Sequence, residues 1–243
     1  MTKAGTHTMR IDVLTLFPDM FPGVLDASIQ ARAAAGGHVE CHVHDIRDWA
    51  DNKHEKVDDR PFGGGPGMVI MCQPLWDAVQ EVEAIVPTPC RRILFTPQGR
   101  RLDQELVEEL SREERLMLIA GHYEGIDERV IMELDPLEIS VGDYVLTGGE
   151  LPSMLLMDAV TRLQEGVLGH EDSASEDSFC ALGENRERLL EAPHYTRPRT
   201  WRNQAVPEVL LSGNHEAVAA WRRDQMMKRT RSRRPDLLEQ CNN

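Results

Sequence analysis

ISVGDYVLTGGE, at residues 139–150, decides the fold when it is read together with GHYEGIDERV at residues 121–130. Apolar runs lead into both motifs, RLMLIA at 115–120 and LEISV at 137–141, and such runs are typical of buried strands in a parallel sheet. Both motifs are therefore predicted to be loops that leave the ends of core strands. Open α/β sheets bind their ligands at such loops.

Glycines give the later motif its chemical character. They occupy positions 142, 148 and 149 and alternate with three bulkier residues, Tyr144, Val145 and Leu146. Glycine lets a backbone approach a ligand closely, and aliphatic side chains can cover the faces of a flat one. The motif therefore predicts a site for a flat ligand; a glycine-rich turn that serves only the fold has the same composition.

Strand-like and helix-like segments alternate along the rest of the chain. Apolar and β-branched runs predict strands at residues 11–17, 38–44 and 91–96, and helical spacing of apolar residues predicts helices at 19–35, 73–85, 102–110, 152–162 and 216–230. This order implies an α/β fold, a parallel sheet with helices on both faces. Residues 45–66 and 165–188 lack apolar periodicity and are expected to form a surface loop and a linker.

The composition predicts a soluble, cytoplasmic protein with no membrane partner. A chain of 243 residues can bury a core as one large domain or two smaller ones. It has no apolar run of about 18 residues and no signal-peptide pattern. Its five cysteines, at positions 41, 72, 90, 180 and 241, form no CxxC pair, which favours reduced thiols over disulfides or a zinc site.

The charge is unevenly distributed along the chain. The formal net charge is −14, yet residues 195–235 hold ten lysines and arginines against three acidic residues, +7 in all, which leaves −21 for the remainder. Trp201 and Trp221 are interleaved with these cations and could stack on bases. The segment is interpreted as a basic nucleic-acid-binding module, with a solvated charged helix as the alternative.

Hydrolytic and metal-dependent mechanisms find little support in the sequence. It has no Ser-His-Asp order, no Cys-His pair with credible spacing and no G-x-S-x-G elbow. His38, Cys41, His42 and His44 lie close together, but no second cluster would complete a tetrahedral metal site. GGGPG at residues 63–67 is not a phosphate-binding loop, because no Gly-Lys-Ser/Thr follows it.

Four further motifs accompany the two glycine-containing ones. They are DDRPFGGGPGM at 58–68, FTPQGRRLD at 95–103, LGHEDSASEDSF at 168–179 and PHYTRP at 193–198. All six, in this order, closely resemble the bacterial tRNA (guanine-N1)-methyltransferases of the SPOUT superfamily. The resemblance covers nearly all of the chain from Met9 onward.

This resemblance implies a domain organisation that periodicity alone does not predict. It implies a methyl-donor-binding domain at residues 9–165 that ends in a deep trefoil knot, a flexible linker at 166–192 that carries the catalytic aspartate, and a small, basic, α-helical tRNA-binding domain at 193–243. It also implies a homodimer whose interface holds the site.

The resemblance further implies the reaction and its ligands. The family methylates N1 of the guanosine just 3′ of the anticodon, position 37, in tRNAs where another guanosine precedes it, and uses S-adenosylmethionine and magnesium. The methyl donor is expected to bind among Leu94, Phe95, Thr96, Pro97, Gly121, Tyr123, Glu124, Val141, Gly142, Asp143, Tyr144, Val145, Leu146, Gly148 and Gly149. Methyl transfer suits these residues because the donor is already activated. The protein need only bind and align the two substrates and deprotonate the acceptor.

Two catalytic roles follow from the same resemblance. Asp177 is expected to be the general base that takes the N1 proton, and Arg162 to stabilise the charge that develops toward O6. The residues alone do not choose Asp177 over Glu171, Asp172 or Glu176. Arg162 could equally be a cation at the end of a helix.

Three features depart from the family pattern. His122 stands where the family commonly carries arginine, which predicts a cationic contact to substrate that is weaker or depends on pH. Residues 183–188 lengthen the linker, and residues 1–8 match no part of the pattern.

Two other readings compete with the methyltransferase. A nicotinamide-dependent dehydrogenase would share the alternating strands and helices, but the chain lacks G-x-G-x-x-G after a strand. An RNA-binding protein without catalysis would explain the basic tail and leave the glycine loops without a purpose.

Overall fold

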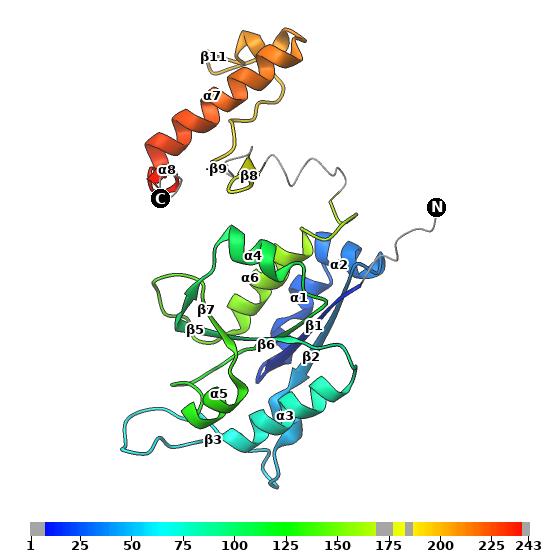
Figure 1. Ribbon diagram of the computed structural model, residues 1–243, viewed down its shortest axis with the longest axis vertical. Helices are drawn as coiled ribbons and strands as arrows, with labels where there is room; N and C mark the ends of the chain where they lie inside the picture. The colour runs from blue at the N-terminus through cyan, green and yellow to red at the C-terminus, as the bar shows by residue number, and fades with distance from the viewer. Residues whose placement is uncertain (1–7, 169–176, 183–186, 240–243) are drawn as a thin grey trace. The chain divides into compact units, whose positions relative to one another are not determined.

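The computed structural model describes residues 8–168, 177–182 and 187–239 (Figure 1). The chain divides into two compact units, residues 1–168 and 169–243. The motif acids Glu171, Asp172 and Glu176 lie outside the described residues.

A parallel five-stranded sheet is the centre of the first unit. Its strand order is β2-β1-β6-β5-β7, and every neighbouring pair is parallel. The strands are β1 Met9–Thr15, β2 Val39–Asp45, β5 Arg91–Arg101, β6 Arg115–Ile119 and β7 Leu137–Ser140. All five residues of β6 are buried, as the apolar run predicted. The predicted parallel sheet is thereby confirmed.

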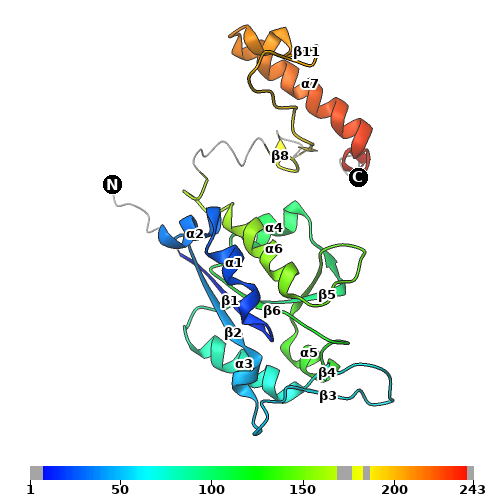
Figure 2. The ribbon, with the colours of Figure 1, turned by 180° about the vertical axis from the view of Figure 1, so that it is seen from behind.

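Helices cover both faces of this sheet (Figures 1 and 2). One face packs against α2 Ser28–Ala35, α4 Gln104–Leu110 and α6 Glu150–Thr161, and the other against α3 Cys72–Ala84 and α5 Glu128–Leu134. Two apolar cores result, one on each side of the sheet. The α/β class predicted from the alternation of elements is confirmed.

One predicted helix and one predicted loop differ from the structure. The segment predicted as one helix at residues 19–35 is divided into η1 Pro18–Met20, α1 Pro22–Leu25 and α2, and the backbone between α1 and α2 leaves helical geometry at Ala27, which is extended at φ −122° and ψ 149°. The α5 helix begins in the GIDERV sequence, which is predicted as a loop, and extends to Leu134. Asp127 begins it by accepting a hydrogen bond from the Arg129 backbone N–H at 3.0 Å.

The loop predicted at residues 45–66 contains short ordered pieces. They are η2 Ile46–Trp49 and β3 Asp58–Asp59, and β3 pairs with β4 Val69–Ile70 in an antiparallel ribbon. Ile46 is fully buried, so this segment contributes to the core as well as to the surface.

A buried ion pair lies between β1 and β6, which the sequence predicts as apolar strands. Arg115 and Asp12 are 1% and 0% exposed, and Arg115 Nε donates to Asp12 Oδ2 at 3.0 Å. The Arg115 guanidinium also donates to the carbonyls of residues 82, 83, 86 and 88 around the end of α3. Arg10 and His44 donate further hydrogen bonds to Asp12. Burial alone would raise the pKa of Asp12, but these three partners together hold it well below its ordinary range.

Asp12 is therefore expected to make stability depend on pH. Because its folded-state pKa is depressed, its contribution is present above the unfolded pKa and is lost as the pH falls below about 5. Asp12→Asn should lower the free energy of unfolding by about 2 kcal/mol at pH 7 and by less at pH 3. Urea unfolding at both pH values checks this, with the exposed Asp26→Asn as the control. An equal loss at both pH values would contradict it.

The second unit is described by itself. It contains the ribbons β8 Ala181–Leu182 with β9 Glu187–Arg188 and β10 Thr200–Trp201 with β11 Gln204–Ala205, then η4 Glu208–Leu211, the 19-residue α7 His215–Arg233 and α8 Asp236–Glu239. Leu189 is buried, and the Leu190 N–H donates to the buried Thr230 Oγ1 at 2.8 Å, which ties the chain before the basic segment to α7. Within the described ranges, no helix combines the length and apolarity that crossing a bilayer requires.

Candidate active site

A cavity of about 460 Å³ lies beyond the carboxyl ends of β5, β6 and β7. Of the fifteen residues predicted to bind the methyl donor, all but Asp143 line it. The lining also includes residues that the prediction did not name, among them His122, Ile126, Glu128, Glu138, Ile139 and Thr147. Three sequence-distant loops therefore converge on one hollow, at the edge where parallel sheets bind ligands.

Close backbone contact explains the glycine at position 149. Its N–H donates to the Gly121 carbonyl at 2.7 Å, and a Cβ on it would stand 2.7 Å from the Ala120 Cα. Because this neighbour is backbone and cannot rotate away, only glycine lets the two loops meet. The approach joins the loop after β6 to the loop after β7.

A four-residue protrusion in β5 forms another wall. Phe95 and Arg100 both align with Ile139 of β7, so residues 96–99 bulge out of the sheet toward the cavity. A Cβ on Gly99 would stand 2.4 Å from the backbone of Glu138 and Ile139. The sequence predicts that this strand ends at residue 96, but pairing with β7 resumes at Arg100 and extends it.

The glycine-rich segment at 63–67 also approaches this site. The Glu124 N–H donates to the Met68 carbonyl at 3.0 Å, and a Cβ on Gly67 would stand 2.2 Å from Glu124 Oε1. Gly67 has a φ of +77°, which glycine adopts without strain. This segment thus packs on the Tyr123–Glu124 turn, where Tyr123 itself has a φ of 60°.

Exposed apolar side chains stand at the rim of the cavity. Tyr144, Val145 and Leu146 are 55%, 84% and 38% exposed, although they belong to the motif that decides the fold. Apolar residues that stay exposed beside a cavity are typical of a surface that a ligand or another chain covers.

The two predicted catalytic residues lie in different units. Arg162 ends α6, where its N–H donates to the Asp158 carbonyl at 3.2 Å. Asp177 lies just before β8, and its carbonyl accepts from the Cys180 N–H at 3.3 Å. Both side chains are half-buried, and the structure describes each within its own unit.

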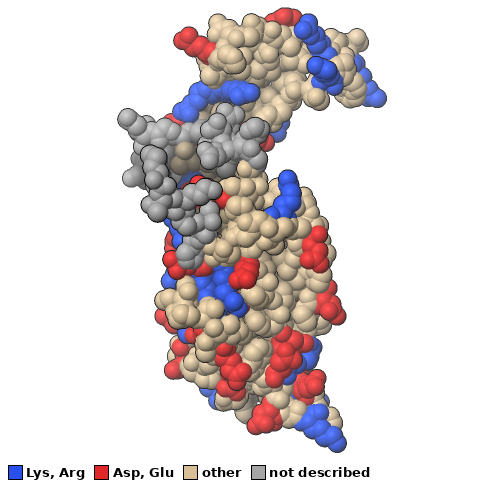
Figure 3. Space-filling model, turned by 90° about the vertical axis from the view of Figure 1, so that its right-hand side faces the viewer, with Lys and Arg blue, Asp and Glu red and all other residues tan. Residues whose placement is uncertain are grey.

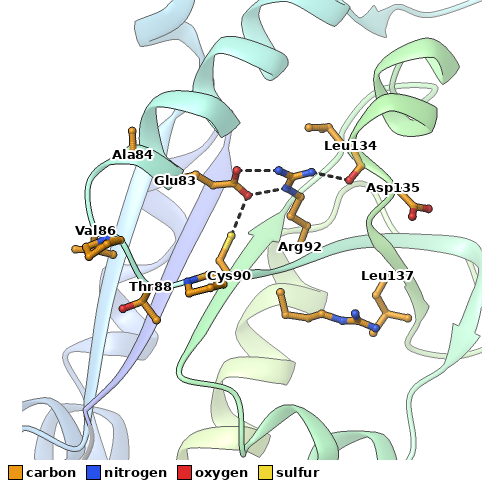
Figure 4. Close-up of a pocket in the computed structure, with 12 residues that line it drawn as sticks. Glu83, Ala84, Val86, Thr88, Cys90, Arg92, Leu134, Asp135 and Leu137 are labelled. Carbon is orange, nitrogen blue, oxygen red and sulfur yellow. Dashed lines mark hydrogen bonds and ion pairs between the residues drawn. The ribbon is translucent and has the colours of Figure 1, made fainter.

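A second, larger cavity of about 610 Å³ lies at the opposite, amino end of β5 and β7 (Figure 4). Three of its polar side chains pair with one another: Arg92 donates to both Glu83 oxygens at 2.6 and 2.8 Å and to the Leu134 carbonyl at 2.8 Å. Cys90 Sγ donates to Glu83 Oε1 at 3.0 Å, and burial with this contact raises the pKa of the thiol to about 12. A thiol with such a pKa stays protonated, so these groups stabilise the fold instead of offering chemistry.

The fold is that of an α/β domain with a cavity lined by glycine-containing loops at the carboxyl edge of its sheet. A family model described as tRNA (Guanine-1)-methyltransferase TrmD matches residues 9–240. The chain belongs to this family, which confirms the predicted resemblance and shows that the protein is a methyltransferase.

Curated relatives agree with this assignment over nearly their whole length. The chain is 56% identical to the tRNA (guanine-N(1)-)-methyltransferase of Moorella thermoacetica over 238 residues, 96% of this chain and 92% of the relative. It is 53% identical to that of Rhodopirellula baltica, covering 95% and 94% of the two chains, and 53% identical to that of Geobacillus kaustophilus, covering 96% and 92%.

Proposed function

We propose that this enzyme transfers a methyl group from S-adenosylmethionine to N1 of the guanosine at position 37 of tRNA, in the cytoplasm. The observation that carries the proposal is the convergence of the three loops on one cavity in a chain of this family. The names of the relatives support guanine N1 as the acceptor.

The cavity suits S-adenosylmethionine, which supplies a methyl group activated on a sulfonium. Gly148 and Gly149 line the cavity, and Cβ atoms there would meet Glu150 Oε2 and the Ala120 Cα at 2.2 and 2.7 Å, so these two residues border it with backbone alone. Backbone groups from the three loops line the cavity, where they would lie close to a bound ligand. The apolar side chains at the rim of the cavity could cover the flat faces of that ligand.

Two side chains are proposed to act on the acceptor base. The Asp177 carboxylate would take the proton from guanine N1 as N1 attacks the methyl carbon, and the Arg162 guanidinium would stabilise negative charge toward O6. Unpaired anticodon-loop bases can be turned out of their stack at modest cost, so N1 can reach both groups.

Magnesium, which the family resemblance also implies, enters no step of this mechanism. Among the residues described, no group of three or more His, Cys, Asp or Glu side chains is placed to hold a metal ion. Glu124, Glu128 and Glu138 line the cavity from three different elements. Because these carboxylates are separated, each could supply at most one or two ligands to a magnesium ion, and water molecules would supply its other ligands.

A homodimer with a knotted donor domain completes the proposed architecture. The family supports a trefoil knot at the end of a domain spanning residues 9–165, in the region where the close contacts at Gly99 and Gly149 pack the loops together. The dimer is supported by Leu151 and Leu155, which are 54% and 47% exposed one turn apart on α6. They continue the exposed apolar rim of the glycine loop.

The second unit is proposed to bind the tRNA, with residues 166–192 as linker and 193–243 as binding domain. Figure 3 shows Lys and Arg side chains along its surface, where few acidic ones are visible. Trp201 is 60% exposed, and the Arg202 guanidinium lies 4.8 Å from the centre of its ring. Arg202 and Asn203 both have positive φ, as a tight hairpin turn requires. The turn therefore presents Trp201 and Arg202 outward.

Trp201→Ala is expected to weaken tRNA binding about tenfold, because an exposed aromatic that stacks on a base contributes about 1–3 kcal/mol. Filter binding at fixed salt measures the affinity. S-adenosylmethionine binding should not change. Trp201→Phe, which keeps an aromatic ring at this position, is the matched control and should bind tRNA nearly as tightly as the wild type. Unchanged tRNA affinity in Trp201→Ala would remove this hairpin from the interface.

Calorimetry separates the three functions that the sequence leaves open. The methyltransferase should bind S-adenosylmethionine and not a nicotinamide dinucleotide, a dehydrogenase should do the reverse, and a protein that only binds RNA should take up neither. Uptake of the nicotinamide cofactor alone would refute the proposed function.

A further inference from the structure

A buried carboxylate lies directly behind the donor cavity. Glu150, the first residue of α6, is 2% exposed, and its Oε1 accepts a hydrogen bond from Thr15 Oγ1 at 2.9 Å. Its other oxygen, Oε2, lies 3.7 Å from Nδ1 of His122. A neutral hydroxyl does not compensate a buried negative charge, which costs several kcal/mol when left unpaired. The His122 ring is the neighbour that can supply the opposite charge.

The His122 ring is held in place from two sides. The centre of its ring lies 4.6 Å from that of Phe17 and 5.0 Å from that of Tyr123. Its Nδ1 is buried and has no hydrogen-bond partner within the described part of the chain. The side chain is 22% exposed and lines the cavity. One ring edge therefore faces the buried carboxylate while the residue itself borders the site.

Gly148 makes this meeting possible. A Cβ at this position would stand 2.2 Å from Glu150 Oε2 and 2.6 Å from His122 Nδ1, in the space between the two groups. Gly148 also forms a backbone bridge with His122. The glycine motif thus serves the pairing of these two side chains as well as the approach of a ligand.

We propose that His122 is a positioning residue for methyl-donor binding, and that it acts by pairing with Glu150. When both ring nitrogens carry protons, Nδ1–H donates to the Glu150 carboxylate, and the pair holds the loop after β6 against the loop after β7. The inference rests on the proposed function, because it assigns the donor to this cavity.

Other charged and titratable groups lie around the pair. The Arg47 guanidinium is 5.7 Å from the centre of the Phe17 ring, behind the stack, and Tyr123 and Glu124 follow His122 in the chain. Arg47 is already hydrogen-bonded to the Leu16 carbonyl and to Asp45. Glu150 is thus the group that faces Nδ1 of the ring directly.

The pairing predicts a sign for the effect of pH. The charged form of the ring, which is the form that pairs with Glu150, is favoured at the lower pH, so the loops should be held more firmly, and the donor bound more tightly, there. A charge-assisted hydrogen bond gained or lost corresponds to about a tenfold change in affinity. The rate of methyl transfer should instead rise with pH, because the general base that accepts the guanine proton must be deprotonated. The affinity for the donor in the absence of tRNA is therefore the quantity to measure.

Calorimetry of S-adenosylmethionine on the full-length protein at pH 6 and pH 8.5 tests the proposal. The wild type and the control His54→Asn, which changes an exposed histidine, should bind about tenfold more tightly at pH 6. His122→Asn and Glu150→Gln should bind weakly and equally at both pH values. His122→Arg, which keeps a cation beside Glu150, should bind tightly at both. A pH effect that survives in His122→Asn would overturn the proposal.

A second measurement does not need the donor. In proton NMR, the resonances of the His122 ring protons should shift when Glu150→Gln removes the carboxylate charge beside the ring, with circular dichroism confirming that the variant is folded. Unchanged ring resonances would overturn the pairing even if no donor binds. Conversely, a wild type that fails to bind S-adenosylmethionine at either pH while the ring resonances shift would refute the proposed function and leave the pairing intact.

Discussion

Replacing Asp177 with asparagine is expected to slow methyl transfer by at least about 10²-fold, because general-base catalysis typically contributes that much or more. Asparagine keeps the shape and the hydrogen-bonding capacity of the side chain but cannot accept the guanine N1 proton. Single-turnover kinetics with saturating tRNA and S-adenosylmethionine measure the step directly, and the affinities for both substrates should change little.

The neighbouring acids provide the controls for this experiment. The sequence offers Glu171, Asp172 and Glu176 in the same motif, and single amide replacements of these three should retain most of the rate. If Asp177→Asn kept most of its single-turnover rate while one of the three lost it, the role of base would move to that residue.

Most of the sheet could be predicted from sequence because its strands are continuous apolar runs. β1 and β6 are buried on both faces, so their residues need no alternation and stand out in the sequence. The parallel order then followed from helices between the strands. What the pattern could not reveal was Arg115, whose charge within an apolar run is compensated by Asp12, 103 residues away.

Short helices and irregular strands escaped prediction for local reasons. The α5 helix has seven residues and begins inside a motif whose glycines indicate loop. β5 contains Pro97 and Gly99, which normally end a strand, and pairing with β7 resumes beyond them. Contacts with residues far away in the sequence stabilise both elements, and the local sequence does not reveal those contacts.

The cavity lining was largely predictable because three motifs supply it. The pairing of His122 with Glu150 could not be predicted from the sequence. A histidine in the place of an arginine suggests a contact to substrate, and Glu150, which follows two glycines, looks like an ordinary first residue of a helix. The clash that a Cβ at Gly148 would make between them is visible only in three dimensions.

Heterodimers are expected to recover about half of the wild-type activity when each protomer carries a different lesion. Asp177 lies in the second unit and the cavity in the first, so in a two-fold dimer each protomer can lend its aspartate to its partner's cavity. One protomer would carry Asp177→Asn and the other Leu146→Asp, which places a charge at the rim of the donor cavity. One complete site then remains per dimer.

The choice of cavity lesion follows from the structure. Gly149→Val would force a side chain against the Ala120 backbone and endanger folding, whereas Leu146 is partly exposed. Purification through two different tags isolates the heterodimer, and single-turnover rates per dimer are compared with the wild type. The reciprocal control pairs a wild-type protomer with one that carries both lesions. If the sites are shared between protomers, this control should be inactive. If each site is built within one chain, this control should keep about half of the activity and the heterodimer with one lesion in each protomer should be inactive.

The central claim is that the chain makes 1-methylguanosine at position 37 of tRNA. The most direct test incubates unmodified tRNA with the purified protein and S-adenosylmethionine, and then analyses the nucleosides and the nuclease fragments by mass spectrometry. The account predicts 1-methylguanosine in the fragment that contains position 37, and only in tRNAs with a guanosine before it. A different methylated nucleoside, or 1-methylguanosine at another position, would contradict it.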